Sequence, residues 1–232
     1  MNSKLRTLVK KLMAKVLPDS KKLVYLAYLP RIKTFLNTHT EDYPVFENRL
    51  KLYDYINNKS IDNGTIEYLE FGVYYGASIK YWSNLNTNAN SKFYGFDTFT
   101  GLPEKWENFT GSMHMNYHDV SGKYPQIDDK RVSFIKGLFQ NTLPVFLKSF
   151  KCNSQLIINN DSDLYSSTLF VLTYASNLLV PGTIIIFDEF SSMLHEFRAL
   201  EDYCLAYMRK YKVLAAVVAD INYYSTVAIM FE

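Results

Sequence analysis

The sequence has little cysteine and no long apolar run. Only Cys152 and Cys204 occur among its 232 residues, so there is no disulfide framework and a reducing compartment is the simple interpretation. No stretch approaches the roughly 20 consecutive apolar residues that span a bilayer, and the N-terminus lacks the features of a signal peptide. We therefore expect a cytoplasmic protein without a membrane-spanning segment.

Internal repeats and low-complexity tracts are also missing. Hydrophobic residues make up 48% of the chain and aromatic residues 16%, which is enough apolar surface to offset the entropy of folding and speaks against a disordered protein. The length fits one large α/β domain. We expect this domain over residues 41–232, preceded by a basic arm over residues 1–40.

Acidic residues are nearly absent from that arm. It contains nine lysines and arginines but only one acid, Asp19, and its net charge is +8. Because the whole chain carries +2, the remaining residues carry −6. A nucleic-acid binder would be expected to carry its basic residues on the folded body. We therefore expect no nucleic-acid partner.

The beginning of the arm has the pattern of an amphipathic helix over residues 3–17, ended by Pro18. Lysines fall on faces other than the one formed by its apolar residues, which are Leu5, Leu8, Val9, Leu12, Met13, Val16 and Leu17. Such a helix can lie on an anionic membrane, placing the protein peripherally at the inner face. The same stripe could instead dock on the body or on a second subunit in a homo-oligomer.

Short apolar runs then alternate with helical stretches, which predicts βαβ units and a doubly wound, mostly parallel sheet. The apolar runs cover residues 66–73, 92–99, 131–137, 155–161 and 182–190, and a helix is predicted over 45–57. Two final strand-like runs, 211–220 and 224–232, are close enough for an antiparallel hairpin.

The connection over residues 100–130 has no helical period and is long for a compact domain. Loops of this length are often lids or binding loops, and disorder is the alternative. We expect a lid-like insertion. Its candidates for contact with a substrate are Trp106, Phe109, His114, Met115, Tyr117 and His118.

The first predicted strand ends in "EFGVYYGAS", where Gly72 and Gly76 would let the backbone approach a ligand closely. Ligands of doubly wound sheets bind beyond the carboxyl ends of the strands, so this turn belongs to the expected site. The spacing is not GxGxxG, which gives little support to a dinucleotide.

Acids near the ends of the first two strands indicate the ligand. Asp97 ends the second strand, where a carboxylate can accept hydrogen bonds from both hydroxyls of a ribose. Glu70 precedes Gly72, and we expect it to face the same crevice and hold a cationic group such as an amino-acid ammonium. An amino acid joined to a nucleoside describes S-adenosylmethionine.

The fourth and fifth strands also end on acids, Asp161 and Asp163 on one and Asp188 and Glu189 on the other. Neighbouring strands lie about 4.8 Å apart, so these carboxylates can converge on one hard cation such as Mg²⁺. Histidine and cysteine are absent there, which argues against zinc. The alternative is that Asp161 caps the helix beginning near Leu164 and Glu189 is merely exposed.

Together these segments resemble the macrocin O-methyltransferase (TylF-like) family of class I S-adenosylmethionine-dependent enzymes, which methylate sugar hydroxyls. The matching motifs are spread in family order over roughly residues 46–205, and they are "YLEFGVYYGASI", "FYGFDTFTGLPE", "VSFIKGLFQNTLP", "NDSDLYSSTLFVL" and "VPGTIIIFDEF". The most specific are "GFDTFTGLP" and "DSDLYSST".

The resemblance implies a Rossmann-like sheet of seven strands in the order 3-2-1-4-5-7-6. It implies that the cofactor is lined by Glu70, Gly72, Ser78, Asp97, Gly137 and Leu138. It further implies Asp161, Asp188 and Glu189 as metal ligands and Asp163 as general base. The chain departs from the family in having Glu189 in place of an aspartate and Asn160 in place of an apolar residue.

These residues give one main hypothesis, an in-line methyl transfer from S-adenosylmethionine to a sugar or glycoside hydroxyl. Mg²⁺ held by Asp161 would lower the pKa of the hydroxyl, and Asp163 would accept its proton. The basic helix suggests a surface polysaccharide or glycolipid precursor as acceptor. The alternatives are a glycosyltransferase using Asp-Ser-Asp as a DxD motif, a non-catalytic membrane-associated binding module, and His118 or His195 as the base.

Overall fold

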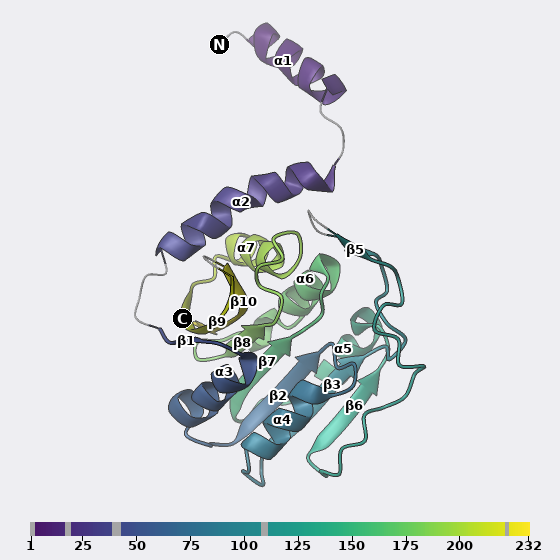
Figure 1. The fold of residues 1–232 in the computed structure, drawn as a ribbon, viewed down its shortest axis with the longest axis vertical. Helices are drawn as coiled ribbons and strands as arrows, with labels where there is room; N and C mark the ends of the chain where they lie inside the picture. The colour runs from purple at the N-terminus through teal and green to yellow at the C-terminus, as the bar shows by residue number, and fades with distance from the viewer. Residues whose placement is uncertain (1–2, 17–19, 39–42, 108–110, 221–222) are drawn as a thin grey trace.

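The computed structural model describes residues 3–16, 20–38, 43–107, 111–220 and 223–232 (Figure 1). At its centre is an eight-stranded sheet in the order β1-β9-β10-β8-β7-β2-β3-β6. Its strands are β1 (Val45–Phe46), β2 (Ile66–Phe71), β3 (Lys92–Asp97), β6 (Val132–Lys136), β7 (Gln155–Asn160), β8 (Ile184–Phe187), β9 (Tyr211–Asp220) and β10 (Tyr223–Phe231).

The order of the sheet confirms the prediction. In chain order, the strands from β2 to β10 that belong to this sheet follow the pattern 3-2-1-4-5-7-6. The central pairs are parallel, and β9 and β10 form the predicted antiparallel hairpin. The expected count of seven is one short, because β1 adds an edge strand that pairs in parallel with β9.

The first element after the arm differs from the predicted helix over residues 45–57. Val45 and Phe46 pair with β9, and α3 (Arg49–Tyr55) begins only after them. The side chain of Asn48 caps this helix by accepting the backbone N–H of Lys51. A π-helical segment, η1 (Ile56–Ile61), continues it. The apolar residues of this stretch thus belong partly to a short edge strand and partly to a helix.

Helices cover both faces of the sheet (Figure 1). On one face lie α3 and α4 (Ala77–Leu85), and on the other lie α5 (Phe139–Leu147), α6 (Tyr165–Tyr174) and α7 (Glu196–Tyr207). Successive residues of a strand point to opposite faces. In β2, Tyr68 therefore packs with Trp82 of α4, whereas Phe71 packs on the α5 face against Phe139.

The second half of the arm forms a helix that the sequence pattern did not predict, α2 (Lys21–Thr38), with Pro30 inside it. The buried ring of Phe35 lies 4.9 Å from Phe190 and 6.0 Å from Phe197. The hydroxyl of Tyr28 donates to Asp202 of α7 at 2.7 Å. This half of the arm is therefore packed on the body.

The first half of the arm forms α1 (Ser3–Val16), as predicted, and Figure 1 shows it standing away from the body. Its apolar residues Leu5, Leu8, Val9, Leu12 and Met13 are exposed, with Leu8 at 63% and Leu12 at 64%. Docking of this stripe on the body does not occur in this structure. Among the described residues, no helix has the length and apolar content needed to cross a membrane.

Candidate active site

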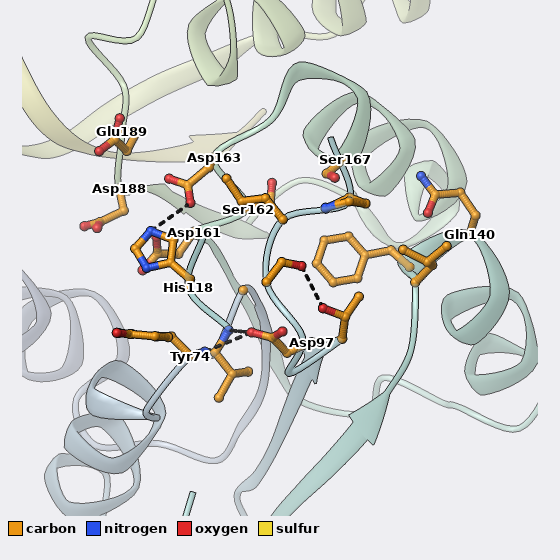
Figure 2. A pocket seen from close by; sticks show the side chains of 18 of the residues that line it. Tyr74, Asp97, His118, Gln140, Asp161, Ser162, Asp163, Ser167, Asp188 and Glu189 are labelled. Carbon is orange, nitrogen blue, oxygen red and sulfur yellow. Dashed lines mark hydrogen bonds and ion pairs between the residues drawn. The ribbon is translucent and has the colours of Figure 1, made fainter. Parts of the chain in front are cut away.

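A cavity of about 270 Å³ opens beyond the carboxyl ends of the parallel strands (Figure 2). This is where ligands bind in sheets of this kind. Seven of the predicted site residues line it, namely Gly72, Asp97, Leu138, Asp161, Asp163, Asp188 and Glu189. Four others, Glu70, Gly76, Ser78 and Gly137, are not part of its wall.

Asp97 fixes one side of the cavity. One of its carboxylate oxygens accepts the backbone N–H groups of Val73 and Tyr74 at 2.7 and 2.9 Å, and the other accepts that of Phe99 at 2.7 Å. A carboxylate has about four acceptor positions, so about one remains for a ligand hydroxyl. Asp97 thus holds the turn after β2 in place and is left with capacity for one hydroxyl rather than two.

Glu70 lies behind the cavity, on the face of β2 that packs against α4. Its side chain is buried and accepts the hydroxyl of Tyr68 at 2.5 Å. Burial raises the pKa of Glu70 to about 8, so this group is largely protonated at neutral pH. Ser78 is buried on the same side, near the Tyr53 hydroxyl. The expected crevice-facing carboxylate is therefore absent at Glu70, because strand alternation turns it toward α4.

The two glycines of the first turn serve packing of the protein itself. Gly72 has φ +93°, and a Cβ there would lie 1.7 Å from the carbonyl oxygen of Asp161. Gly76 has φ +76°, and a Cβ there would lie 2.7 Å from Pro125 in the long connection. Another segment of the chain therefore closely approaches both glycines, and the predicted approach to a ligand stays a prediction.

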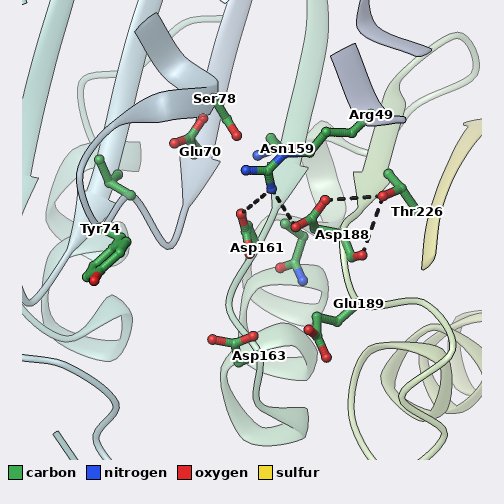
Figure 3. A network of polar contacts seen from close by, with 12 residues as sticks. Arg49, Glu70, Tyr74, Ser78, Asn159, Asp161, Asp163, Asp188, Glu189 and Thr226 are labelled. Carbon is green, nitrogen blue, oxygen red and sulfur yellow. Dashed lines mark hydrogen bonds and ion pairs between the residues drawn. The ribbon is translucent and has the colours of Figure 1, made fainter. Parts of the chain in front are cut away.

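The register of β7 and β8 places two acids side by side. Asn160 pairs with Phe187, so Asp161 and Asp188 follow as the next neighbours in these parallel strands. Continuing the alternation of both strands, they face α3. The next residue, Glu189, points away from them and toward the side on which Asp163 lies (Figure 3).

A cation does lie between Asp161 and Asp188, and it belongs to the protein. The Nη1 atom of Arg49 is 2.6 Å from Oδ2 of Asp188 and 3.5 Å from Oδ2 of Asp161 (Figure 3). Thr226 donates to the other oxygen of Asp188 at 3.2 Å. Among the described residues, no group of three His, Cys, Asp or Glu side chains is arranged to hold a metal. Two of the three predicted ligands thus share a cation position and Glu189 does not.

Asp163 occupies a sharp turn between β7 and α6. Its φ is +60°, a conformation unusual outside glycine, and the N–H of Leu164 donates across it to the carbonyl of Ser162 at 2.7 Å. Burial, together with the charges of Glu189, Asp188 and Asp97, raises the pKa of Asp163 to about 7. A carboxyl group in this state can accept and release a proton near neutral pH.

The long connection brings one of its predicted residues to this acid. Nε2 of His118 lies 3.7 Å from Oδ2 of Asp163, and burial lowers the pKa of His118, which keeps the ring neutral at neutral pH. The other described candidates from this segment, Trp106, His114, Met115 and Tyr117, do not line the cavity, and Phe109 lies outside the described residues.

His195, considered as an alternative base, has a structural role. Its Nε2 contacts the carbonyl of Glu107 at 2.7 Å, and its Nδ1 accepts the N–H of Tyr165 at 3.3 Å. Its ring also stacks on Trp106. Through these contacts it joins the hairpin of β4 (Trp106–Glu107) and β5 (Ser112–Met113) to the start of α6. Neither nitrogen is left for proton transfer.

Asn160, the unexpected polar residue before the acids, belongs to a buried network. Its amide donates to Thr168 at 3.0 Å and to Glu196 at 3.2 Å. Glu196 also accepts the backbone N–H of Glu189 at 2.9 Å. This network ties the ends of β7 and β8 to α6 and α7 from the face opposite α3, which holds the backbone of both acidic turns.

Comparisons with known proteins agree with this fold. A family model described as Macrocin-O-methyltransferase (TylF) matches residues 46–230. Among solved structures, the chain is similar to the calicheamicin methyltransferase CalS11, with 21% identity, a TM-score of 0.62, and coverage of 99% of this chain and 94% of that one. An apo structure of CalS11, at 19% identity, a TM-score of 0.53, and coverage of 99% and 96%, is described as a TDP-rhamnose 3'-O-methyltransferase.

The chain is also similar to the O-methyltransferase NovP, with 19% identity, a TM-score of 0.59, and 78% of each chain covered. A structure of cmcI with Mg and SAM has 16% identity, a TM-score of 0.52, and coverage of 79% of this chain and 70% of that one. The curated proteins give no match. At these identities, the solved structures show a shared fold.

The contact at Gly72 can be tested against a matched glycine. Gly182 has nearly the same φ, +94°, but a Cβ there would meet nothing within 4 Å. Gly182→Ala should lower the free energy of unfolding by about 1–2 kcal/mol, the cost of left-handed backbone. Gly72→Ala should lose a further amount of roughly 1–3 kcal/mol or more from the clash with Asp161. Equal losses in urea denaturation would contradict the proposed packing role.

Proposed function

The chain belongs to the macrocin O-methyltransferase (TylF) family and is a methyltransferase of the O-methylating class. We propose that it transfers the methyl group of S-adenosylmethionine to a hydroxyl of a sugar or glycoside, with residues 41–232 as the catalytic domain. The sugar acceptor is supported by the description of CalS11 as a TDP-rhamnose 3'-O-methyltransferase. A surface polysaccharide or glycolipid precursor is one acceptor of this class.

The observation that carries the proposal is the state of Asp163. It lines the cavity, and its carboxyl group has a pKa of about 7. Among the described residues, the one basic side chain within 4 Å of this carboxyl group is His118, whose ring is neutral. A base is most effective when its pKa lies near the working pH. Asp163 would therefore take the proton of the acceptor hydroxyl on its carboxylate.

The donor would occupy the remainder of the same cavity. Asp97 lines the cavity (Figure 2), and so do Leu138 and Phe139. We propose that Asp97 accepts one ribose hydroxyl and that the apolar surface of Leu138 and Phe139 contacts the base. This arrangement would direct the sulfonium methyl toward the acidic end, where the hydroxyl is deprotonated.

The acidic end fits a divalent cation through two carboxylates. Arg49 Nη1 contacts both Asp161 and Asp188, and this supports the proposal that one positive centre lies between the pair. We propose these two as the residues that would hold Mg²⁺, which when bound lowers the pKa of a coordinated hydroxyl. Glu189 would act beside Asp163, since its charge contributes to the raised pKa of that group.

Direct binding experiments distinguish methyl transfer from the glycosyltransferase alternative. Calorimetry should detect S-adenosylmethionine binding without added nucleotide sugar, and incubation with TDP-sugars and Mg²⁺ should give a product carrying one additional methyl group by mass spectrometry. Transfer of a sugar from the nucleotide, with no binding of S-adenosylmethionine, would contradict the proposed function.

Removal of the base should separate catalysis from binding. We expect Asp163→Asn to lower kcat by at least about 100-fold, because the amide cannot accept the proton, with little change in the affinity for S-adenosylmethionine. Asp128→Asn, the same change at an exposed acid outside the cavity, should leave kcat unchanged. Equal activity of the two variants would exclude Asp163 as the base.

The pH profile gives a second test of this base. Asp163 accepts a proton only when ionised, and its pKa is about 7. The wild-type kcat/KM should therefore fall as the pH decreases through about 7 and rise to a plateau above it. A profile that stays flat down to about pH 5, where an ordinary aspartate is still ionised, would contradict the assignment.

We also propose that α1 contacts anionic lipid peripherally, since its five basic residues and exposed apolar stripe lie on a helix that the body does not cover. The full chain should float with vesicles containing phosphatidylglycerol, and Leu8→Asp with Leu12→Asp should abolish flotation. Leu205→Asp, at an equally exposed leucine on α7, is the control. Flotation that survives the double substitution would contradict the contact.

A further inference from the structure

Arg49 is placed by its helix at the cation position of the acidic end. It is the first residue of α3, and its side chain reaches the ends of β7 and β8 (Figure 3). A positive charge in the first turn of a helix is unfavourable for the helix dipole. The stability of α3 therefore does not account for this arginine, whereas its ion pairs with Asp161 and Asp188 do.

The guanidinium and a divalent ion cannot share this position. Nη1 lies 2.6 Å from Asp188 and 3.5 Å from Asp161, and Mg²⁺ would bind their oxygens at about 2.0–2.1 Å, in the space that Nη1 fills. The charges lead to the same conclusion. A divalent ion bound to the two carboxylates would repel a guanidinium held at the same position.

The side chain of Arg49 has a route out of the site. It is 37% exposed, and the pair of contacts to Asp161 and Asp188 joins it to the sheet. Asp188 would stay in place without it, because Thr226 holds its other oxygen and the backbone N–H of Asp188 donates to Asn160. The carboxylate of Asp188 is thus anchored from behind, and the backbone of Asp161 is held by its N–H, which donates to Phe71.

We propose that Arg49 and the divalent cation are alternative occupants of the Asp161–Asp188 pair, and that metal binding displaces the arginine. This inference rests on the metal site of the proposed function. In the metal-free protein Arg49 neutralises two adjacent carboxylates that would otherwise repel each other. It also competes with the metal, so the site binds Mg²⁺ more weakly than its carboxylates alone would.

The test is calorimetric titration of MgCl₂ into the protein without donor or acceptor. Arg49→Gln removes the competing charge, and we expect it to bind Mg²⁺ at least about tenfold more tightly than the wild type. Lys51→Gln removes the same charge two residues along α3, from a side chain that pairs with Glu47, and should change the affinity little. Equal or weaker binding by Arg49→Gln, or no binding by either protein, would overturn the inference.

Thermal stability supplies a second measurement from the same variants. Without metal, Arg49→Gln should melt at a lower temperature than the wild type, because Asp161 and Asp188 lose their counter-ion. Saturating MgCl₂ should raise the melting temperature of this variant more than that of the wild type. An equal rise in both proteins would count against displacement.

The wild type alone also tests the displacement, which covers the case in which Arg49→Gln does not fold. The Nε–H signal of Arg49 can be assigned in an arginine-labelled sample by its absence from Arg49→Lys. Saturation with MgCl₂ should shift this signal to the position of an exposed arginine and leave that of Arg131, which pairs with Asp129, unchanged. An unmoved Arg49 signal would overturn the inference.

These outcomes are separable from a failure of the proposed function. The titrations use MgCl₂ alone and do not depend on which donor or acceptor the enzyme uses. If S-adenosylmethionine does not bind while Arg49→Gln binds Mg²⁺ more tightly, the methyl-transfer proposal fails and the displacement stands. If methyl transfer occurs and Mg²⁺ binds neither protein, the displacement fails and Asp163 retains its role.

Discussion

The structure depends most on the repulsion between two carboxylates that the sheet forces together. The register of β7 and β8 makes Asp161 and Asp188 neighbours, and the alternation of side chains turns both toward α3. Burial and the charge of Asp188 raise the pKa of Asp161, and Arg49 opposes this effect. The position of α3, the capped start of that helix and the Thr226 contact hold Arg49 and Asp188 in place beside Asp161.

The same alternation divides the acids into two groups. Asp161 and Asp188 face a cation, while Asp163 and Glu189 lie on the other side. Burial raises the pKa of both of these acids, and the charge of Glu189 adds to the rise at Asp163. The four acids lie in two short motifs, but their side chains point to different sides and therefore have different neighbours. The network of Asn160, Thr168 and Glu196 maintains that separation by holding both turns from the opposite face.

Much of this arrangement could be predicted from the sequence. The apolar runs identified the strands, the resemblance supplied their order, and the strand ends located the acids at one edge. Arg49 could not be found, because it precedes Asp161 by more than a hundred residues and only the fold brings them together. The crowding of Asp161 and Asp163 did indicate a missing positive charge, and the pattern alone could not distinguish an arginine from a metal. Glu70 was misplaced because a residue's distance along a strand does not reveal which face it occupies.

Helix α2 lies outside the family match but packs on the domain that the match covers. The family match begins at residue 46, yet Phe35 packs against Phe190 and Phe197. These two rings belong to the segment that follows Asp188 and Glu189. A fragment cut at the family boundary would leave those rings facing water and loosen the backbone that carries Asp188 and Glu189. Helix α2 thus lies outside the family match, yet through Phe35 it supports the segment that follows Asp188 and Glu189.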